Sequence, residues 1–272
     1  MRWSCAAPSV ATDLMAARDD ILAELGLTPR WRLRDATRTL TGAVVEFAEP
    51  AASYRPPLGV EAADAHDASA RHARIAALTW RDFAADVDAC TACGLCRTRN
   101  KSVPGVGDVD ADWLFVGEAP GAEEDARGEP FVGHAGKLLD NMLGALKMAR
   151  GRNVYIANVL KCRPPNNRTP EPNEAAACRP YLERQIELLR PKLIVALGKS
   201  AATLLLRTDA SIASLRGRIH RYQGLPLIVT YHPAYLLRTP QDKAKAWEDL
   251  LLAKATVADS SRAEAPGPSP VA

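Results

Sequence analysis

From Trp80 onward, short apolar runs alternate with longer segments in which leucines and other apolar residues recur at helical spacing. Uninterrupted apolar runs predict four buried strands, at residues 113–116, 154–159, 193–197 and 225–230. Helical spacing predicts helices at residues 136–148, 173–189, 198–206 and 241–255. Continuous apolar strands separated by helices are typical of a parallel sheet that is covered on both faces. The pattern therefore predicts an α/β fold, with ligands binding at the carboxyl ends of the strands.

The first eighty residues differ from the rest of the chain. Residues 12–25 have the apolar stripe of one amphipathic helix, whereas residues 48–76 are rich in Ala, Pro, Asp and His and show little periodicity. Such a composition buries too little apolar surface to offset the entropy of ordering, which favours a flexible linker. We expect an extension over 1–79 that is partly helical and partly disordered, a catalytic domain over 80–256 and a disordered tail over 257–272.

Composition excludes several classes of protein. The chain has 272 residues, of which 47% are hydrophobic and 25% charged, so it is neither wholly disordered nor fibrous. No apolar run approaches the length of a membrane span, and the N-terminus lacks the apolar core of a secretory signal. We therefore expect a cytoplasmic protein with reduced thiols. The formal net charge of +3 allows an anionic partner without requiring one.

Cysteine spacing indicates a metal site. Cys90 and Cys93 form a CxxC unit, and Cys162 and Cys178 are separated by fifteen residues. Such a unit and two distant thiols can close a four-thiolate site, for zinc by default or equally for an iron–sulfur cluster. Cys96 is a competing ligand, because CxxCxxC contains two overlapping pairs, and the alternative is a set of buried free cysteines.

Polar residues follow three of the predicted strands. An acidic loop, GEAPGAEED, begins at Gly117, Asn158 lies within the second strand, and His232 follows the fourth. Taken singly, each has an ordinary structural explanation: the loop is a solvated turn, the asparagine caps a neighbouring loop, and the histidine is structural. Because parallel strands bring them to one edge of a sheet, we expect a functional site there.

Seven segments in order resemble the family 4 uracil-DNA glycosylases, bacterial and archaeal enzymes that carry an iron–sulfur cluster. They are CTAC at 90–93, GEAPGAEED, GEPFVG, VYIANVLKCRPPNNRTP, the helix of Cys178, LIVALG and HPAYLLR. The resemblance covers residues 80–255 and leaves the first eighty unexplained. It implies a three-layer α/β/α sandwich with a central four-stranded parallel sheet.

The resemblance also implies the cofactor, a 4Fe-4S cluster. Its expected ligands are Cys90, Cys93, Cys162 and Cys178, while Cys96 has no counterpart in the family pattern. The cluster is expected to be structural and to fix the loop that carries Arg163 and Arg168 beside DNA.

The implied reaction is hydrolysis of the bond between uracil and deoxyribose, the first step of base-excision repair. The base must leave the stack, and Phe131 corresponds to the aromatic residue on which it then lies. Asn158 corresponds to the amide that accepts from uracil N3–H and donates to O4. Cytosine presents the opposite pattern and would leave buried polar groups unpaired.

Cleavage leaves negative charge on the uracil, and His232 corresponds to the donor aimed at O2, a contribution of about 3 kcal/mol. Ala119 stands where family 1 enzymes have an Asp, so Glu118 and Glu124 are the substitutes considered, with Glu124 preferred for activating water. Backbone groups from Glu118 through Ala119 to Gly121 are expected to contact the uracil edge.

The expected substrate is uracil-containing DNA, single- or double-stranded, bound by a monomer. The residues expected to contact it are Lys161, Arg163, Arg168, Arg216, Arg218, Tyr235, Leu236 and Arg238. Leu236 and Leu237 fit either a wedge that fills the gap left by the flipped base or the protein core.

Two alternatives remain open at this point. One is a cluster-containing DNA-binding module without glycosylase activity, which the presence of Phe131, Asn158 and His232 disfavours. The other is a glycosylase for a broader set of deaminated bases, since Asn158 favours uracil without excluding hypoxanthine or xanthine.

Overall fold

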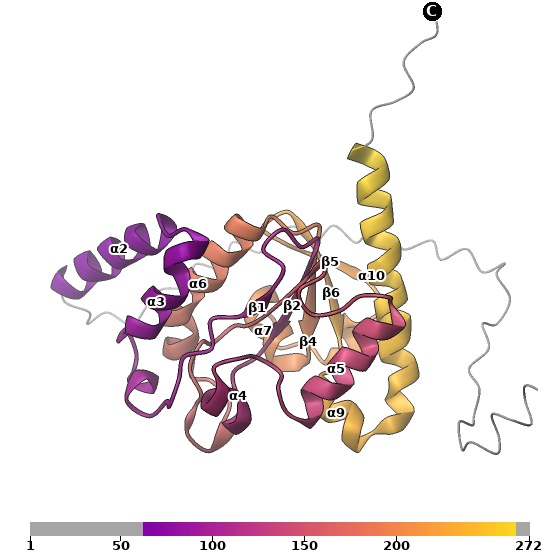
Figure 1. The fold of residues 1–272 in the computed structure, drawn as a ribbon, viewed down its shortest axis with the longest axis horizontal. Coiled ribbons are helices and arrows are strands. Elements are labelled where there is room, and N and C mark those ends of the chain that lie inside the picture. The colour runs from indigo at the N-terminus through magenta and orange to yellow at the C-terminus, as the bar shows by residue number, and fades with distance from the viewer. Residues whose placement is uncertain (1–61, 265–272) are drawn as a thin grey trace, which may run out of the picture. The chain divides into compact units, whose positions relative to one another are not determined.

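A six-stranded sheet forms the centre of the protein, in a computed structural model that describes residues 62–264 (Figure 1). The strand order is β1-β3-β2-β4-β6-β5. The strands are β1 (Val106–Gly107), β2 (Trp113–Gly117), β3 (Val154–Asn158), β4 (Leu193–Leu197), β5 (Ile219–Tyr222) and β6 (Leu225–Thr230).

Four of these strands, β3, β2, β4 and β6, run parallel in the middle of the sheet and confirm the predicted parallel core. Two short antiparallel strands, β1 and β5, extend it at the edges and were not predicted. The hairpin between β5 and β6 turns at Gln223 and Gly224, whose φ angles are 48° and 83°. Two consecutive positive φ angles are typical of a tight hairpin turn that suits the twist of its strands.

Side chains alternate between the two faces of the sheet, so each apolar run supplies two cores. On β2, Leu114 and Val116 face one core, and Trp113 and Phe115 face the other. Because neither face is open to water, every residue of β2, β3 and β4 is buried, which explains why their sequences are continuously apolar.

Helices cover both faces and complete the three-layer α/β/α sandwich. Core contacts place α6, α7 and α8 on one face, and α5 and α10 on the other (Figure 1). The α-helices are α2 (Ala62–Ala76), α3 (Trp80–Ala89), α4 (Ala122–Arg127), α5 (His134–Ala145), α6 (Pro172–Leu189), α7 (Lys199–Leu206), α8 (Ile212–Leu215), α9 (Pro233–Arg238) and α10 (Lys243–Glu264). Short 3-10 helices are η1 (Gly94–Arg97), η2 (Pro165–Asn167) and η3 (Pro240–Asp242).

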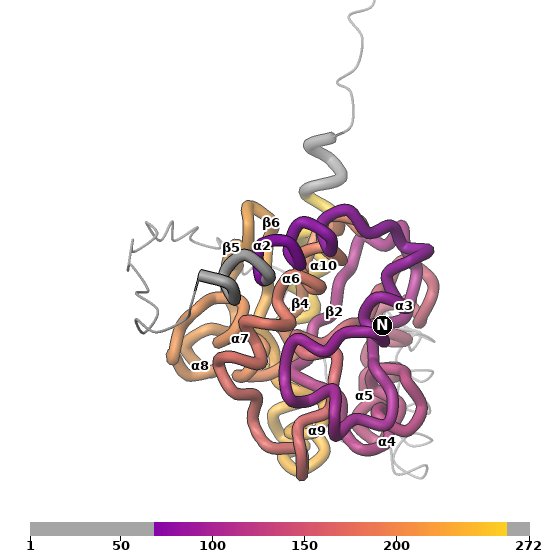
Figure 2. The backbone as a smooth tube through the Cα atoms, turned by 90° about the vertical axis from the view of Figure 1, so that its left-hand side faces the viewer, coloured from indigo at the N-terminus to yellow at the C-terminus, as the bar shows by residue number. Residues whose placement is uncertain are grey.

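The region before Trp80 corrects one prediction. Residues 62–76, which were expected to belong to a flexible linker, form helix α2, which lies against α6 (Figure 2). Ile75 on this helix is fully buried beside Phe83 and Tyr181. Alanine-rich sequence has high helix propensity, and the packing of one apolar side chain on α3 and α6 decides the outcome. The compact domain therefore begins upstream of Trp80. The helix predicted over 12–25 lies outside the described residues.

The C-terminal helix is longer than predicted. Helix α10 continues to Glu264, whereas the sequence pattern predicted its end near Ala255 and disorder from Val257. Residues after Val257 lose apolar periodicity but keep good helix formers, and the first proline is Pro266. Across residues 62–264, none of the helices is both long enough and apolar enough to cross a membrane.

Candidate functional site

The candidate site is built around Gly117, the last residue of β2. Gly117 pairs in register with Asn158, the last residue of β3. A methyl group at position 117 would lie 2.3 Å from Asn158 Oδ1 and 2.7 Å from Phe131 Cζ. The missing side chain therefore lets an amide and an aromatic ring approach each other at the carboxyl end of the sheet, where the strand order predicts a ligand site.

Asn158 keeps its side-chain amide free for a ligand. The residue is only 2% exposed, and its backbone carbonyl accepts a hydrogen bond from Lys161 Nζ at 2.7 Å. Among the described residues, no hydrogen bond engages its side-chain amide. Within residues 62–264 the amide therefore caps no loop, unlike in the loop-capping alternative, and its donor and acceptor are both available there.

Phe131 reaches the site from the loop between α4 and α5. Its φ angle is 55°, a left-handed conformation that an aromatic residue rarely adopts. A Cβ at Gly136 would lie only 1.7 Å from the Phe131 carbonyl oxygen, so the turn also requires that glycine. The Phe131 ring stacks on the His232 ring, with centroids 5.4 Å apart and planes inclined by 29°. Phe131, Asn158 and His232, which lie far apart in the sequence, thus lie together at the end of the sheet.

His232 caps helix α9, and this contact fixes its tautomer. Its Nδ1 accepts a hydrogen bond from the Ala234 backbone N–H at 3.1 Å. The pKa of His232 is lowered to about 4, mainly by burial and also by nearby Arg238, while Glu124 partly opposes the shift. The imidazole is therefore neutral at pH 7, and its proton is on Nε2, which is left as a donor.

Two acidic residues flank the site. Backbone N–H groups donate to Glu124, whereas a side-chain hydroxyl is the partner of Glu118. Glu124 accepts from the Gly121 N–H through Oε2 and from the Val132 N–H through Oε1, both at 3.1 Å. It thereby ties together the two glycine-rich loops. Burial raises the pKa of the Glu118 carboxyl, although a hydrogen bond with the Ser200 hydroxyl opposes the rise. Ala119 packs against an apolar cluster that contains Leu95, Leu160 and Cys162.

Three of the residues expected to contact DNA have partners within the protein: Lys161 and Leu236 are buried, and the Arg216 side chain is 16% exposed. Lys161 is 1% exposed, and its ammonium contacts the Asn158 carbonyl and Gln185 Oε1. Arg216 pairs with buried Asp249 at 3.1 Å, and Leu236 is 1% exposed in the core beside Tyr231. A cation or an apolar residue in a loop motif can be internal, and sequence alone does not distinguish that case from an exposed one.

The remaining residues expected to contact DNA are exposed or half-buried. Leu237 is 44% exposed, so the wedge interpretation survives for this leucine and not for Leu236. Arg218 and Arg238 are exposed, and Arg163 bonds only Asn167 among the described residues. Arg168 is half-buried and forms a bidentate ion pair with Glu174, in which Nη1 donates to Oε2 at 2.9 Å and Nη2 to Oε1 at 2.6 Å. The Tyr235 hydroxyl donates to Asp242.

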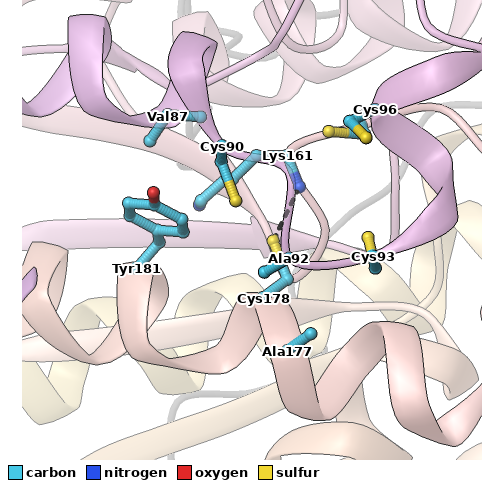
Figure 3. A pocket seen from close by; sticks show the side chains of 10 residues that line it. Val87, Cys90, Ala92, Cys93, Cys96, Lys161, Ala177, Cys178 and Tyr181 are labelled. Carbon is cyan, nitrogen blue, oxygen red and sulfur yellow. Dashed lines mark hydrogen bonds between the residues drawn. The ribbon is translucent and has the colours of Figure 1, made fainter. Parts of the chain in front are cut away.

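A second site is a cavity lined by thiols between α3, η1, the loop after β3 and α6 (Figure 3). It brings together Cys90, Cys93, Cys162 and Cys178 as predicted, and Cys96 lines it as well. Among the described residues, no three histidine, cysteine or acidic side chains lie close enough together to hold a single metal ion.

Cationic and amide donors surround these thiols. Arg99 donates to Cys162 Sγ at 2.8 Å, the Lys161 backbone N–H to Cys178 Sγ at 3.2 Å, and Arg71 to Cys90 Sγ at 3.5 Å. Burial raises the pKa of the Cys178 thiol to about 12. For Cys90 burial alone would raise the pKa, but hydrogen bonds from Ala92 and Arg71 lower it overall.

Arg71 and Arg99 were missed by sequence reasoning. Arg71 lies in the segment interpreted as a linker, and Arg99 is one of several cations that follow Cys96. Arg99 reaches a thiol 63 positions along the chain, and no local pattern marks such a contact.

Comparison with known proteins matches residues 104–251 to the uracil-DNA glycosylase superfamily. The type-4 uracil-DNA glycosylase of Archaeoglobus fulgidus is 45% identical over 168 residues, which cover 59% of this chain and 84% of that protein. The type-4 uracil-DNA glycosylase of Thermotoga maritima is 46% identical over 175 residues, covering 63% of this chain and 91% of that protein.

The geometry around His232 predicts its titration. The buried ring should remain neutral down to about pH 4, with Nε2 protonated and Nδ1 bare. Nitrogen NMR of protein labelled at histidine measures both properties, and the His232→Gln variant identifies which signals belong to this residue.

The same shift sets the sign of a stability effect. The unfolded state takes up a proton near pH 6.5 and the folded state only near 4, so His232 should make stability fall as pH decreases through this window. A His232 pKa near 6.5, or a proton on Nδ1, would contradict the assignment.

Proposed function

Because this chain belongs to the type-4 uracil-DNA glycosylases of the uracil-DNA glycosylase superfamily, we propose that it hydrolyses the bond between uracil and deoxyribose in DNA. The products are free uracil and an abasic site, which initiates base-excision repair. The observation that carries the proposal is the meeting of a stacking ring, a free amide and a neutral imidazole donor at one end of the sheet.

Base recognition rests on Phe131 and Asn158. A uracil flipped out of the helix lies on the Phe131 ring, and the Asn158 amide accepts from N3–H and donates to O4. Cytosine has an acceptor at N3 and donors at N4, so it would leave the same amide facing like groups. Mismatched polar groups in a buried site are costly, which supports discrimination by this one side chain.

Departure of the base rests on His232. As the C1′–N1 bond breaks, its electron pair moves onto the uracil ring, and charge accumulates at O2 and N1. A neutral imidazole that presents Nε2–H toward O2 stabilises this anion without itself releasing the proton. A donor placed where charge develops contributes about 3 kcal/mol to the rate.

The sugar becomes cationic, and water supplies the new bond at C1′. We assign Glu118 to stabilising that cation or orienting the water. Both carboxylate oxygens of Glu124 already accept from backbone amides, which supports a positioning role for it. Glu118 follows Gly117 directly, and its partner is a hydroxyl on the neighbouring helix α7.

The assay for this function is release of uracil from single- and double-stranded oligonucleotides, detected by alkaline cleavage at abasic sites. Asn158→Asp keeps an acceptor for N3–H but replaces the donor to O4. We expect uracil release to fall about tenfold to a hundredfold, equivalent to one lost hydrogen bond in a buried site, and cytosine release to become detectable.

Asn141→Asp makes the same chemical change on the exposed surface of α5 and should leave release unchanged. No uracil release by the native protein would refute the function. Full uracil selectivity in Asn158→Asp would refute the role of that side chain alone.

We also propose that Cys90, Cys93, Cys162 and Cys178 hold a 4Fe-4S cluster. A cluster bound by four thiolates carries net negative charge, and the cavity is built for an anion. Lys161 is fully buried beside the thiols, and no carboxylate among the described residues lies within ion-pair distance of its ammonium. An unpaired buried cation is costly, and a bound anionic cluster would compensate it.

The four thiols fit a cluster. A cubane of four irons and four sulfides is held by four thiolates, and Cys90, Cys93, Cys162 and Cys178 all line one cavity. When bound, the cluster supplies a structural link between α3, the loop after β3 and α6. Cys96 lines the same cavity and is the alternative fourth ligand to Cys93.

If the thiols hold this cluster, the purified protein should be brown, contain four irons per chain and absorb light at about 400 nm. Lys161→Met removes the buried cation while roughly preserving volume, so it should lower iron content after purification. Lys101→Met, at an exposed position, is the matched control. A colourless zinc protein would refute the cluster, and full iron content in Lys161→Met would refute the charge argument.

A further inference from the structure

We infer that Arg150 is a positioning residue that holds Phe131 in its working conformation, an inference that rests on the proposed function of Phe131 as the base platform. Arg150 follows α5 and lies 19 positions after Phe131 in the sequence. It has no part in the site by motif, and its role emerges only from contacts.

The guanidinium of Arg150 bridges two consecutive backbone carbonyls. Its Nη1 donates to the Pro130 carbonyl at 2.8 Å and its Nη2 to the Phe131 carbonyl at 2.5 Å. The third nitrogen, Nε, donates to Asp140 Oδ1 at 2.6 Å, which anchors the guanidinium to helix α5. All three nitrogens of the planar group are thus used, two of them on the segment that carries the ring.

That segment needs an external constraint. Phe131 has a φ angle of 55°, and a non-glycine residue in the left-handed region is strained by about 1–3 kcal/mol. The strain must be offset by contacts that favour this conformation over the ordinary one. Two charge-assisted hydrogen bonds to the carbonyls on either side of the strained φ and ψ angles meet that need.

A second contact holds the segment from its other end. Glu124 Oε1 accepts from the Val132 N–H at 3.1 Å. Three consecutive residues, Pro130, Phe131 and Val132, are therefore fixed by one cation and one anion, and the ring between them is directed onto His232 and over Gly117. We call Arg150 and Glu124 the loop clamp.

This role requires an arginine at position 150. A lysine at position 150 would keep the charge and could still pair with Asp140, but a single ammonium does not reproduce the planar fork that bridges two carbonyls. The Arg150 side chain is 24% exposed, and its hydrogen bonds within the described residues all go to Asp140 and this loop. Its loss should therefore affect the ring position more than the core.

The test is a double-mutant cycle on single-turnover uracil release with Arg150→Lys, Phe131→Leu and the combined variant. Arg150→Lys leaves the net charge unchanged, so the general attraction to phosphate is preserved. We expect Arg150→Lys to reduce release at least tenfold. In the Phe131→Leu background it should cost less than twofold, because a residue that acts through Phe131 has nothing left to position.

Chemical rescue of a variant that lacks the guanidinium distinguishes a positioning role of Arg150 from a merely structural one. Guanidinium chloride at a non-denaturing concentration should restore part of the release in Arg150→Ala, and sodium chloride at equal ionic strength should not. Arg152→Lys, at an exposed position two residues away, should behave as the native protein does. Unchanged melting temperatures confirm that each variant is folded.

Additive losses in the cycle, or native release by Arg150→Lys, would overturn the clamp while leaving the proposed function intact. Absence of uracil release in the native protein would instead refute the function on which the clamp depends. The two failures are therefore distinguishable in the same set of reactions.

Discussion

The site depends on the close approach of Asn158 and Phe131 across the end of β2, which is possible only because residue 117 has no side chain. A methyl group there would lie 2.3 Å from the amide oxygen and 2.7 Å from the ring. Several other features serve the same approach. Phe131 adopts a left-handed φ, Gly136 accommodates its carbonyl, and the loop clamp holds the strained segment from both ends. The positions of the polar groups in the site therefore depend on how closely the surrounding residues pack.

Lys161 connects the two sites of the protein. Its ammonium contacts the carbonyl of Asn158, and its backbone N–H contacts the thiol of Cys178. A structural cluster in the thiol cavity would therefore act at short range on the residue that reads the base. In the proposed function, this arrangement would let a cluster with no part in bond cleavage affect base recognition, and it would give buried Lys161 a structural role.

Much of the fold could be predicted because the central strands are buried on both faces, so burial alone dictates their apolar runs. The edge strands could not, since β1 has two residues and β5 alternates between half-buried and exposed positions. Helix α2 was missed because one buried residue, Ile75, decides its packing. Phe131, Asn158 and His232 could be singled out from the sequence because motifs carry them.

The misassigned cations show where such prediction ends. Lys161 and Arg216 lie in segments with the composition of a DNA-binding loop, but their partners, Gln185 and Asp249, are 24 and 33 positions away in the sequence. Arg150 was missed for a related reason, because its partners on the loop of Phe131 are backbone carbonyls, which no side-chain pattern indicates. Contacts between distant segments decide these roles, and only the fold shows them.

The most direct measurement is uracil release by Gly117→Ala. This substitution adds one methyl group at a position whose backbone angles any residue can adopt, so the protein should fold and retain its thiol cavity. The account predicts a melting temperature within a few degrees of the native one and a loss of uracil release of at least a hundredfold, about 3 kcal/mol. Native release by a folded Gly117→Ala protein would show that the approach of Asn158 and Phe131 is not what the site depends on.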